Sequence, residues 1–371
     1  MLIFTQYFTP AKKAGGPITS ILNLVAALDL EFSIVSRGQD INERENLEGI
    51  LVDTWTDSKR NYFVGMGFSS LLHYLKLLRS HSKEVFYING IFDWKMNLLP
   101  MVIGKKLIVS PRGMLQQGAL KNGSIKKGFY LAICRYQLKT KNVTWHATDE
   151  VEAKDIELIF GKQKIKVISN LVNLSDSREL QTTKKPNHIR LMYYSLISEK
   201  KNLLFLLELL LKWKGSFELA VYGPDKDITY AQKCKDFVAS EANLKDKVHF
   251  YGVIDSHEFS SLADKSDYFV LPTLGENYGH AIVESLALGL PILISDQTPW
   301  KLDSSANNYS ISLDNQNAWL NVLTEISNLD ASAHLQAKLA AQDFFHEHIV
   351  IQQASNITSY KSLFSLSTLA I

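Results

Sequence analysis

This sequence is poor in cysteine, contains no long apolar run and shows no internal repeat. Its 371 residues include only two cysteines, Cys134 and Cys234, in different predicted helices. So few cysteines exclude a disulfide-stapled scaffold and favour a reducing compartment. The richest apolar run, NLLFLLELLL, is about half as long as a membrane helix and contains Glu208, which argues against a membrane span. Hydrophobic residues at 46% and charged residues at 21% are typical of a soluble globular protein.

Acidic residues are absent from one long stretch. Between Asp93 and Asp149 there are ten basic residues and no acidic one. Aromatic and apolar residues are interleaved with the basic ones: Phe129, Tyr130, Leu131, Ile133 and Tyr136. Such a stretch suits an anionic membrane surface or a phosphorylated acceptor, and an ordinary solvated helix face is the alternative. A nucleic-acid partner is not expected, because no reader motif accompanies the basic residues.

Strand-like and helix-like segments alternate in two successive series. The first contains the candidate strands MLIFTQYF, EFSIVS, EVFYING, KLIVSP, VTWHAT and KIKVIS. The second contains IRLMYYS, FELAVYG, KVHFYG, SDYFVLP and LPILIS. Two such series predict two doubly wound parallel sheets, with Rossmann-like domains at 1–172 and 187–348 and a polar linker at 173–188. The chain start has no basic region and no cleavage site, so it is expected to be a first strand and not a leader.

The segment Pro272–Trp300, PTLGENYGHAIVESLALGLPILISDQTPW, holds two glutamates in a strand–loop–helix frame. SDYFVLPT predicts a buried strand that ends at the start of this segment. Apolar residues from about His280 to Leu288 recur at helical spacing, and a glycine and a proline follow them. Glu276 is therefore expected in the loop and Glu284 within the helix.

Such a frame suits a sugar nucleotide. Phosphates bind at helix N-termini, where backbone N–H groups are unpaired and the helix dipole is positive. A carboxylate accepts two hydroxyl hydrogen bonds at once, which suits the vicinal diols of a sugar or ribose. The alternative is a surface acid in a loop and an ordinary helix glutamate. Gly275 and Gly279 favour the ligand interpretation, because glycine lets a ligand approach the backbone.

These residues resemble the signature of the family 4 retaining glycosyltransferases, which have the GT-B fold. That signature is a glutamate, seven residues, a second glutamate and a G-x-P turn; here it is Glu276, Glu284 and SLALGLP. NYGHAIVES and SDQTPW are most similar to members that build bacterial surface polysaccharides. The resemblance runs along most of the chain and implies two Rossmann-like domains facing a cleft. It also implies a C-terminal tail, at about 349–371, that crosses back to the first domain.

The resemblance implies a metal-independent retaining transferase. It would move a sugar from a nucleoside diphosphate donor to a glycan or polyprenyl-diphosphate-linked acceptor, in the synthesis of O-antigen or capsule. No cofactor is expected, because the nucleotide sugar is a substrate. Glu276 would contact the donor sugar and Glu284 the ribose, and the donor phosphates would meet the helix start: Asn277, Tyr278, Gly279 and His280. The expected location is cytoplasmic, peripheral on the inner face of the bacterial inner membrane.

Three further loops are expected to contribute to the site. Gly15 and Gly16 follow the first strand and resemble the glycine pair that the family keeps over the donor phosphates; a plain tight turn is the alternative. Arg112, in the sequence PRG at a strand end, is interpreted as a contact to donor phosphate or acceptor, with a surface ion pair as the alternative. Lys201 follows the first strand of the second series and is expected to bind the diphosphate.

One position departs from the family pattern. The family has an arginine five residues before the lysine, and Leu196 stands there instead. Arg112 or Lys301 could replace the missing charge. The departure keeps open a catalytically inactive nucleotide-binding scaffold, and the architecture keeps open a sugar-nucleotide epimerase or a phosphorylase. The sequence Asp225-Lys226-Asp227 is interpreted as an acidic turn and not as a metal site.

Overall fold

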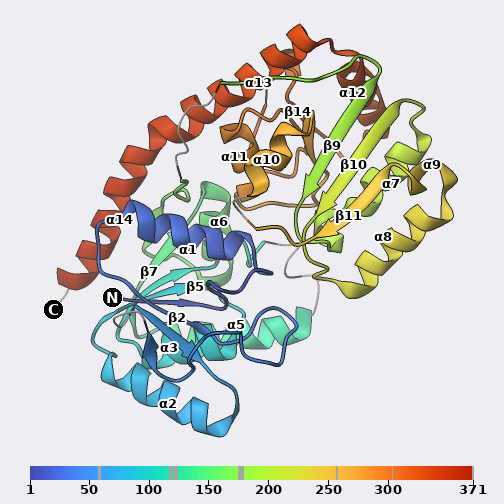
Figure 1. Cartoon of the computed structure of the whole chain (residues 1–371). Helices are drawn as coiled ribbons and strands as arrows, with labels where there is room; N and C mark the ends of the chain where they lie inside the picture. The colour runs from blue at the N-terminus through green and yellow to red at the C-terminus, as the bar shows by residue number, and fades with distance from the viewer. Residues whose placement is uncertain are drawn as a thin grey trace. The chain divides into compact units, whose positions relative to one another are not determined.

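The computed structural model describes residues 1–56, 60–116, 120, 124–173, 179–255, 258–302 and 304–369. The chain divides into two compact units. The first unit combines residues 1–173 with residues 353–371, and the second holds residues 174–352. Each unit is an α/β domain around one sheet (Figure 1). No helix among the described residues is both long enough and apolar enough to span a membrane.

The first unit contains an eight-stranded sheet in the order β3-β4-β2-β1-β5-β6-β7-β8. Its strands are β1 (Leu2–Thr5), β2 (Ser33–Arg37), β3 (Trp55–Thr56), β4 (Asn61–Val64), β5 (Val85–Asn89), β6 (Lys106–Ser110), β7 (Asn142–Ala147) and β8 (Ile165–Val167). All neighbours pair in parallel except β3 and β4. The strand order reverses between β1 and β5, which makes this the switch point where open α/β sheets bind ligands.

Helices cover both faces of this sheet. They are α1 (Gly16–Ala27), α2 (Gly67–Ser80), α3 (Leu99–Ile103), α5 (Ser124–Leu138), α6 (Glu150–Phe160) and α14 (Ile351–Leu369), with a π-helical turn η2 (Trp94–Leu98). Because side chains alternate along a strand, Leu2 and Phe4 enter one core and Ile3 the other. The first core includes side chains of α2, α3, α5 and α6, and the second includes those of α1 and α14. Tyr360 and Phe364 thus attach the C-terminal helix to the first sheet.

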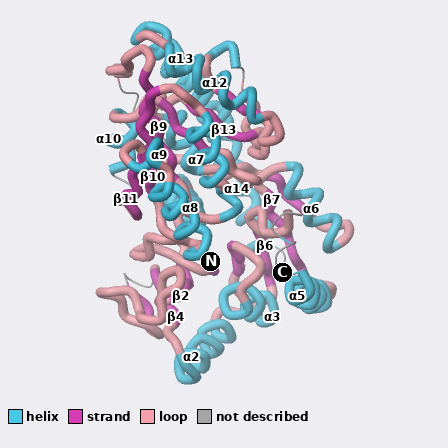
Figure 2. Tube along the Cα trace, turned by 90° about the vertical axis from the view of Figure 1, so that its right-hand side faces the viewer, coloured by secondary structure: helices cyan, strands magenta, loops and turns pink. Residues whose placement is uncertain are grey.

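The second unit contains a six-stranded, all-parallel sheet in the order β11-β10-β9-β12-β13-β14. Its strands are β9 (His188–Tyr194), β10 (Ser216–Tyr222), β11 (Val248–Gly252), β12 (Tyr268–Leu271), β13 (Ile292–Ser295) and β14 (Tyr309–Ile311). The main helices are α7 (Leu203–Lys212), α8 (Ile228–Ser240), α10 (Phe259–Asp264), α11 (His280–Ala287), α12 (Gln316–Asn328) and α13 (Ala331–Phe345). Strands β9, β10 and β11 lie side by side in both views (Figures 1 and 2). The predicted pair of doubly wound parallel sheets is confirmed.

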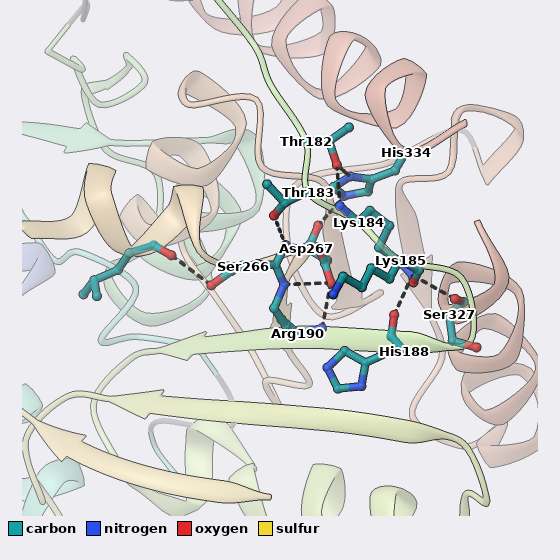
Figure 3. Close-up of polar contacts among 11 residues, drawn as sticks. Thr182, Thr183, Lys184, Lys185, His188, Arg190, Ser266, Asp267, Ser327 and His334 are labelled. Carbon is teal, nitrogen blue, oxygen red and sulfur yellow. Dashed lines mark hydrogen bonds and ion pairs between the residues drawn. The ribbon is translucent and has the colours of Figure 1, made fainter. Parts of the chain in front are cut away.

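A buried polar cluster lies at the amino ends of β9 and β12 (Figure 3). The Lys184 ammonium donates to three backbone carbonyls, those of Lys185, His188 and Ser327, at 2.5–2.8 Å. The buried Asp267 accepts from the guanidinium of Arg190 at 2.6 Å, and His334 contacts the carbonyl of Asp267 at 2.9 Å. This cluster is at the opposite end of the sheet from the strand C-termini. It holds the later part of the predicted linker against the second unit, whereas residues 174–178 lie outside the described part of the chain.

Candidate functional site

Two loops meet at the carboxyl ends of β9 and β12, the switch point of the second sheet. The carbonyl of Lys200, in the loop after β9, accepts from Leu274 N at 2.8 Å and from the hydroxyl of Thr273 at 3.1 Å. The hydroxyl of Ser295, at the end of β13, donates to the carbonyl of Thr273 at 2.5 Å. These bonds fix the glutamate-bearing loop against the lysine-bearing loop, at the position where a doubly wound sheet binds its ligand.

Lys201 and Glu276 form an ion pair within this site. The Lys201 Nζ donates to Glu276 Oε1, and the two side chains are only 15% and 11% exposed. The backbone N–H of Glu276 donates to the carbonyl of Gln297 at 3.0 Å, which fixes the loop from its other side. Sequence considerations assigned the two residues to different parts of the donor. The structure brings them into direct contact, so the charge of each depends on the other.

Two further lysines add positive charge to this ion pair. Burial lowers the pKa of Lys200, the Glu276 carboxylate opposes that shift, and the charges of Lys201 and Lys226 add to it. Burial and the charge of Lys201 also lower the pKa of Lys226, although much of the Lys226 side chain is exposed. Three ammonium groups therefore act on one another beside a single carboxylate. This excess of positive charge suits a ligand with more than one negative charge, such as a diphosphate.

Lys226 is a site residue that the sequence analysis missed. The isolated bridge between Ile197 and Asp225, with Ile197 N donating to the carbonyl of Pro224 at 2.9 Å, places the Lys226 loop beside the loop that carries Leu196. A Cβ at Gly223 would lie 2.0 Å from the carbonyl oxygen of Ser195, so this approach requires glycine. The chain thus presents a cation next to the position where the family arginine is missing.

The aspartates on either side of Lys226 have structural partners. Asp225 forms an ion pair with Lys235 at 2.6 Å, and Asp227 accepts from Tyr230 N at 3.0 Å as the N-cap of α8. No cluster of three or more potential metal-ligating side chains occurs among the described residues. The interpretation of this segment as an acidic turn agrees with these contacts. The one useful signal in the sequence was a lysine at a strand-to-helix loop, the same signal that pointed to Lys201.

The start of α11 holds the loop residues assigned to donor phosphates. Gly279 has a φ of 79°, and a Cβ there would lie 2.9 Å from Ile282 Cδ1. The ring of Tyr278 is buried edge-to-face against Trp300, whose indole N–H donates to the carbonyl of Tyr278 at 2.5 Å. The Tyr278 side chain therefore fixes the loop, and the His280 ring packs 5.1 Å from it. Asn277 lies between Glu276 and this packed turn.

Glu284 lies on α11, and burial raises the pKa of its carboxyl to about 7. In the described part of the chain, no hydrogen bond or ion pair reaches this carboxyl. Burial, and after it the negative charge of Glu284, raises the pKa of Tyr194 at the end of β9 to about 12. A partly desolvated carboxyl without a partner is costly in the unliganded protein. Hydroxyl groups of a ligand would relieve that cost, because they can donate to both oxygens.

The first unit holds the other predicted site residues. Gly15 has a φ of 53° and precedes Gly16 at the start of α1, and a Cβ at Gly15 would meet no atom within 4 Å. Arg112, with a φ of 58°, donates to Asn89 Oδ1 at 2.6 Å and to the Tyr87 hydroxyl at 2.7 Å. It also donates to Asn170. Neutral side chains therefore hold this guanidinium, and no ion pair neutralises it among the described residues.

The geometry agrees with comparisons to known proteins. The model of the family "Glycosyl transferases group 1" matches residues 176–318. The O-antigen chain mannosyltransferase RfbU of Salmonella typhimurium is 27% identical over 191 residues, 49% of this chain and 50% of that protein. The GDP-mannose:cellobiosyl-diphosphopolyprenol alpha-mannosyltransferase of Xanthomonas campestris is 25% identical over 225 residues, 59% of this chain and 57% of that protein. The match thus spans little more than half the length of these curated relatives.

Solved structures show the same fold over nearly the whole chain. Anabaena Alr3699/HepE in complex with UDP-glucose superposes with a TM-score of 0.73 and 12% identity, covering 97% of this chain and 99% of that one. WaaG, a glycosyltransferase involved in lipopolysaccharide biosynthesis, gives a TM-score of 0.70 and 12% identity, with 97% and 99% coverage. Residues 176–318 of this chain belong to the glycosyl transferases group 1 family, within a chain that has the fold of the GT-B glycosyltransferases.

Proposed function

We propose that this protein is a retaining glycosyltransferase that moves a sugar from a nucleoside diphosphate to a glycan or lipid-linked glycan in cell-surface polysaccharide synthesis. The observation that carries the proposal is the cluster of Lys200, Lys201 and Lys226 around Glu276, with the partnerless Glu284 on the adjoining helix. The lysines fit a diphosphate, Glu276 the hydroxyls of the donor sugar and Glu284 the ribose diol.

Catalysis would depend on electrostatic stabilisation and positioning. The bond between the anomeric carbon and the diphosphate oxygen breaks, and the lysines stabilise the charge that develops on the diphosphate. Glu276 holds the donor sugar while an acceptor hydroxyl attacks from the face that the diphosphate leaves. The acceptor proton passes to a donor phosphate oxygen, as the family resemblance implies. No nucleophilic side chain is assigned to this mechanism.

The donor can be identified by thermal-shift measurements with GDP, UDP, GDP-mannose and UDP-glucose. Both curated relatives are named as mannosyltransferases, and one name includes GDP-mannose, so this donor comes first. A ligand at about 100 times its Kd stabilises the native state by about 2.7 kcal/mol. We expect one nucleotide series to raise the melting temperature. The absence of any shift with every nucleotide would refute the proposal, whereas orthophosphate dependence or an epimerised nucleotide would identify a phosphorylase or an epimerase.

Sugar transfer is expected to continue in the presence of a chelator. The charge that stabilises the leaving diphosphate would come from Lys200, Lys201 and Lys226, so a divalent cation is not required in the site. Product formation with and without EDTA, on the same enzyme preparation, measures this. Complete loss of transfer in EDTA, restored by Mg²⁺ or Mn²⁺, would show that a metal performs the role given to the lysines.

Replacement of Lys226 by methionine is expected to lower kcat/KM by about 10–100-fold, because a charge-assisted contact to the diphosphate is lost. Introducing arginine at position 196 of this variant should restore part of the loss, since the loops of Leu196 and Lys226 are adjacent. Lys235→Met is the matched control, because Lys235 pairs with Asp225 on the same loop and helix. Equal losses in the two single variants would show that only the local fold was disturbed. Activity in the wild type would also exclude the inactive scaffold.

The partner surface that remains a proposal is an anionic membrane. Helix α5 exposes Ile125, Phe129 and Tyr136, and Lys126 is exposed beside them. Lys121, which belongs to the same basic stretch of the sequence, lies outside the described residues. Exposed apolar and basic side chains on one helix are typical of binding to the surface of an anionic bilayer. The cytoplasmic face of the inner membrane is the location that this implies.

The double variant K126E/K127E is expected to bind vesicles of anionic lipid more weakly than the wild type. Each lysine near such a surface contributes about 1 kcal/mol, and the contribution falls as salt screens it. Co-sedimentation with anionic and neutral vesicles at low and high salt measures the effect. The control K164E/K166E makes the same charge change on exposed residues at β8. If both double variants bind like the wild type, α5 is an ordinary solvated helix.

A further inference from the structure

The first unit contains a cavity of about 430 Å³ that is separate from the residues described above. Its lining includes Tyr7 after β1, Arg37 at the end of β2, Met66 after β4 and Trp94 at the start of η2, after β5. These four strands are neighbours in the sheet, in the order β4-β2-β1-β5. The cavity therefore lies across the switch point of the first sheet, where open α/β sheets bind small molecules.

Asp93 organises one wall of this cavity. Its buried carboxylate accepts from Lys95 N at 2.9 Å and Met96 N at 2.7 Å, which fixes the start of η2. The other carboxylate oxygen forms an ion pair with Arg37. Lys95 Nζ in turn donates to the carbonyl of Gly65 at 2.6 Å. The side chains that surround the cavity are thus held in place before any ligand arrives, which lowers the entropic cost of binding.

Asp40 fixes the opposite wall. Its Oδ2 accepts from Lys12 N at 2.8 Å and Lys13 N at 3.1 Å, and its Oδ1 accepts from Ile41 N at 2.7 Å. The backbone held in this way leads directly into the Gly15–Gly16 turn. Glu43 forms an ion pair with Lys13 at 2.5 Å on the same wall. Both walls are therefore built from polar contacts between loops that are distant in sequence.

The chemistry of the lining is that of a site for a neutral sugar. Trp94 is 53% exposed and Met66 is 58% exposed, so they offer an apolar surface to the C–H face of a sugar ring. Arg37 and Lys95 supply donors, and Asp40 and Glu43 supply acceptors, in equal number. A polyhydroxylated ligand uses both kinds of group, whereas a multiply charged anion would require an excess of cations.

We infer that this cavity binds a neutral sugar residue of the acceptor, with the ring stacked on Trp94. The assignment of this sugar to an acceptor rests on the proposed transferase function, whereas the existence of the sugar site does not. The donor residues belong to the second unit, so the two sites are tested with different ligands and different variants. The Trp94 site also predicts that the acceptor is recognised by its glycan portion, and not only by a lipid or a diphosphate.

The test is saturation-transfer NMR of the full chain with a panel of uncharged sugars. The panel contains the methyl glycosides of glucose, galactose, mannose and N-acetylglucosamine, and the disaccharides cellobiose and lactose. We expect at least one member to bind, with the strongest transfer to ring C–H protons. Trp94→Ala should weaken its binding by about tenfold, and Trp94→Phe should retain most of it. Met66→Ala tests the facing surface if Trp94→Ala does not fold.

Tyr136→Ala is the matched control, because Tyr136 is an exposed aromatic residue of the same unit outside the cavity. It should leave sugar binding unchanged. The inference is overturned if no panel member binds, if Trp94→Ala and Met66→Ala bind as the wild type does, or if a nucleoside competes for Trp94. Nucleoside diphosphate binding is measured on the same variants. Sugar binding without nucleotide binding would refute the transferase proposal and keep this site; the reverse would refute this site alone.

Discussion

Replacing Glu276 by glutamine is expected to lower sugar transfer by about 10²–10³-fold, while the affinity for free nucleoside diphosphate stays equal or increases. In the wild type, Glu276 neutralises part of the charge of Lys201 and is positioned to hold the donor sugar. The variant loses the contact to the sugar, whose geometry changes as the bond breaks. It also frees Lys201 to act on the diphosphate with its full charge, which opposes any loss of nucleotide binding.

Calorimetry with the nucleoside diphosphate and steady-state kinetics with the nucleotide sugar separate these two effects. Asp225→Asn is the matched control, because it breaks another carboxylate–lysine pair in the same unit, with Lys235. The control should retain both transfer and nucleotide affinity. A Glu276→Gln enzyme that loses nucleotide binding and transfer in the same proportion would show that Glu276 holds the nucleotide itself, and the division of roles would be wrong.

Replacing Glu284 by alanine is expected to weaken nucleoside diphosphate binding by about 1–3 kcal/mol, since two ribose hydroxyls lose their acceptor. The raised pKa adds a pH dependence. Because the carboxyl titrates at about 7, wild-type affinity should increase as pH rises through that value and the carboxylate forms. In Glu284→Gln this component should be absent. The difference between the two proteins removes the titration of the nucleotide phosphates, which both experience equally.

The same residue predicts a stability change of opposite sign. A carboxyl whose pKa is raised from 4.5 to about 7 in the folded state stabilises the protein fully below the lower value. That contribution is lost as the pH rises toward and through about 7. Unliganded Glu284→Gln should therefore be more stable than the wild type near pH 8, by about 1–3 kcal/mol after allowance for partial exposure, and nearly equal near pH 5.

Urea denaturation of the unliganded proteins at the two pH values measures this difference. Glu208→Gln, which changes an exposed glutamate on α7, is the control and should show no such dependence. Equal stability of Glu284→Gln and wild type near both pH values would show that burial of Glu284 has no energetic cost. The expected combination, lower nucleotide affinity with higher stability, would identify Glu284 as a residue kept for binding at the expense of the unliganded fold.

Much of the fold followed from local patterns in the sequence. Apolar runs and helical spacing identified β1, β12, β13 and α11, because residues close in the chain determine these elements. The sequence missed β3 and β4, since WT and NYFV are too short to show a period beside polar loops. Glu276 and Glu284 were placed correctly, in a loop and on a helix. Their order along one strand–loop–helix segment is itself a local property.

What only the tertiary structure decided is which loops meet. The sequence contains Lys201, Lys226 and Glu276 as separate signals, from loops after β9, β10 and β12. They come together because the sheet order is β10-β9-β12, which puts the carboxyl ends of non-consecutive strands side by side. Trp94 and Met66 line one cavity for the same reason, and the pKa of Glu284 depends on burial by distant residues. Local sequence determined the elements, and the long-range pairing of strands determined the chemistry at their ends.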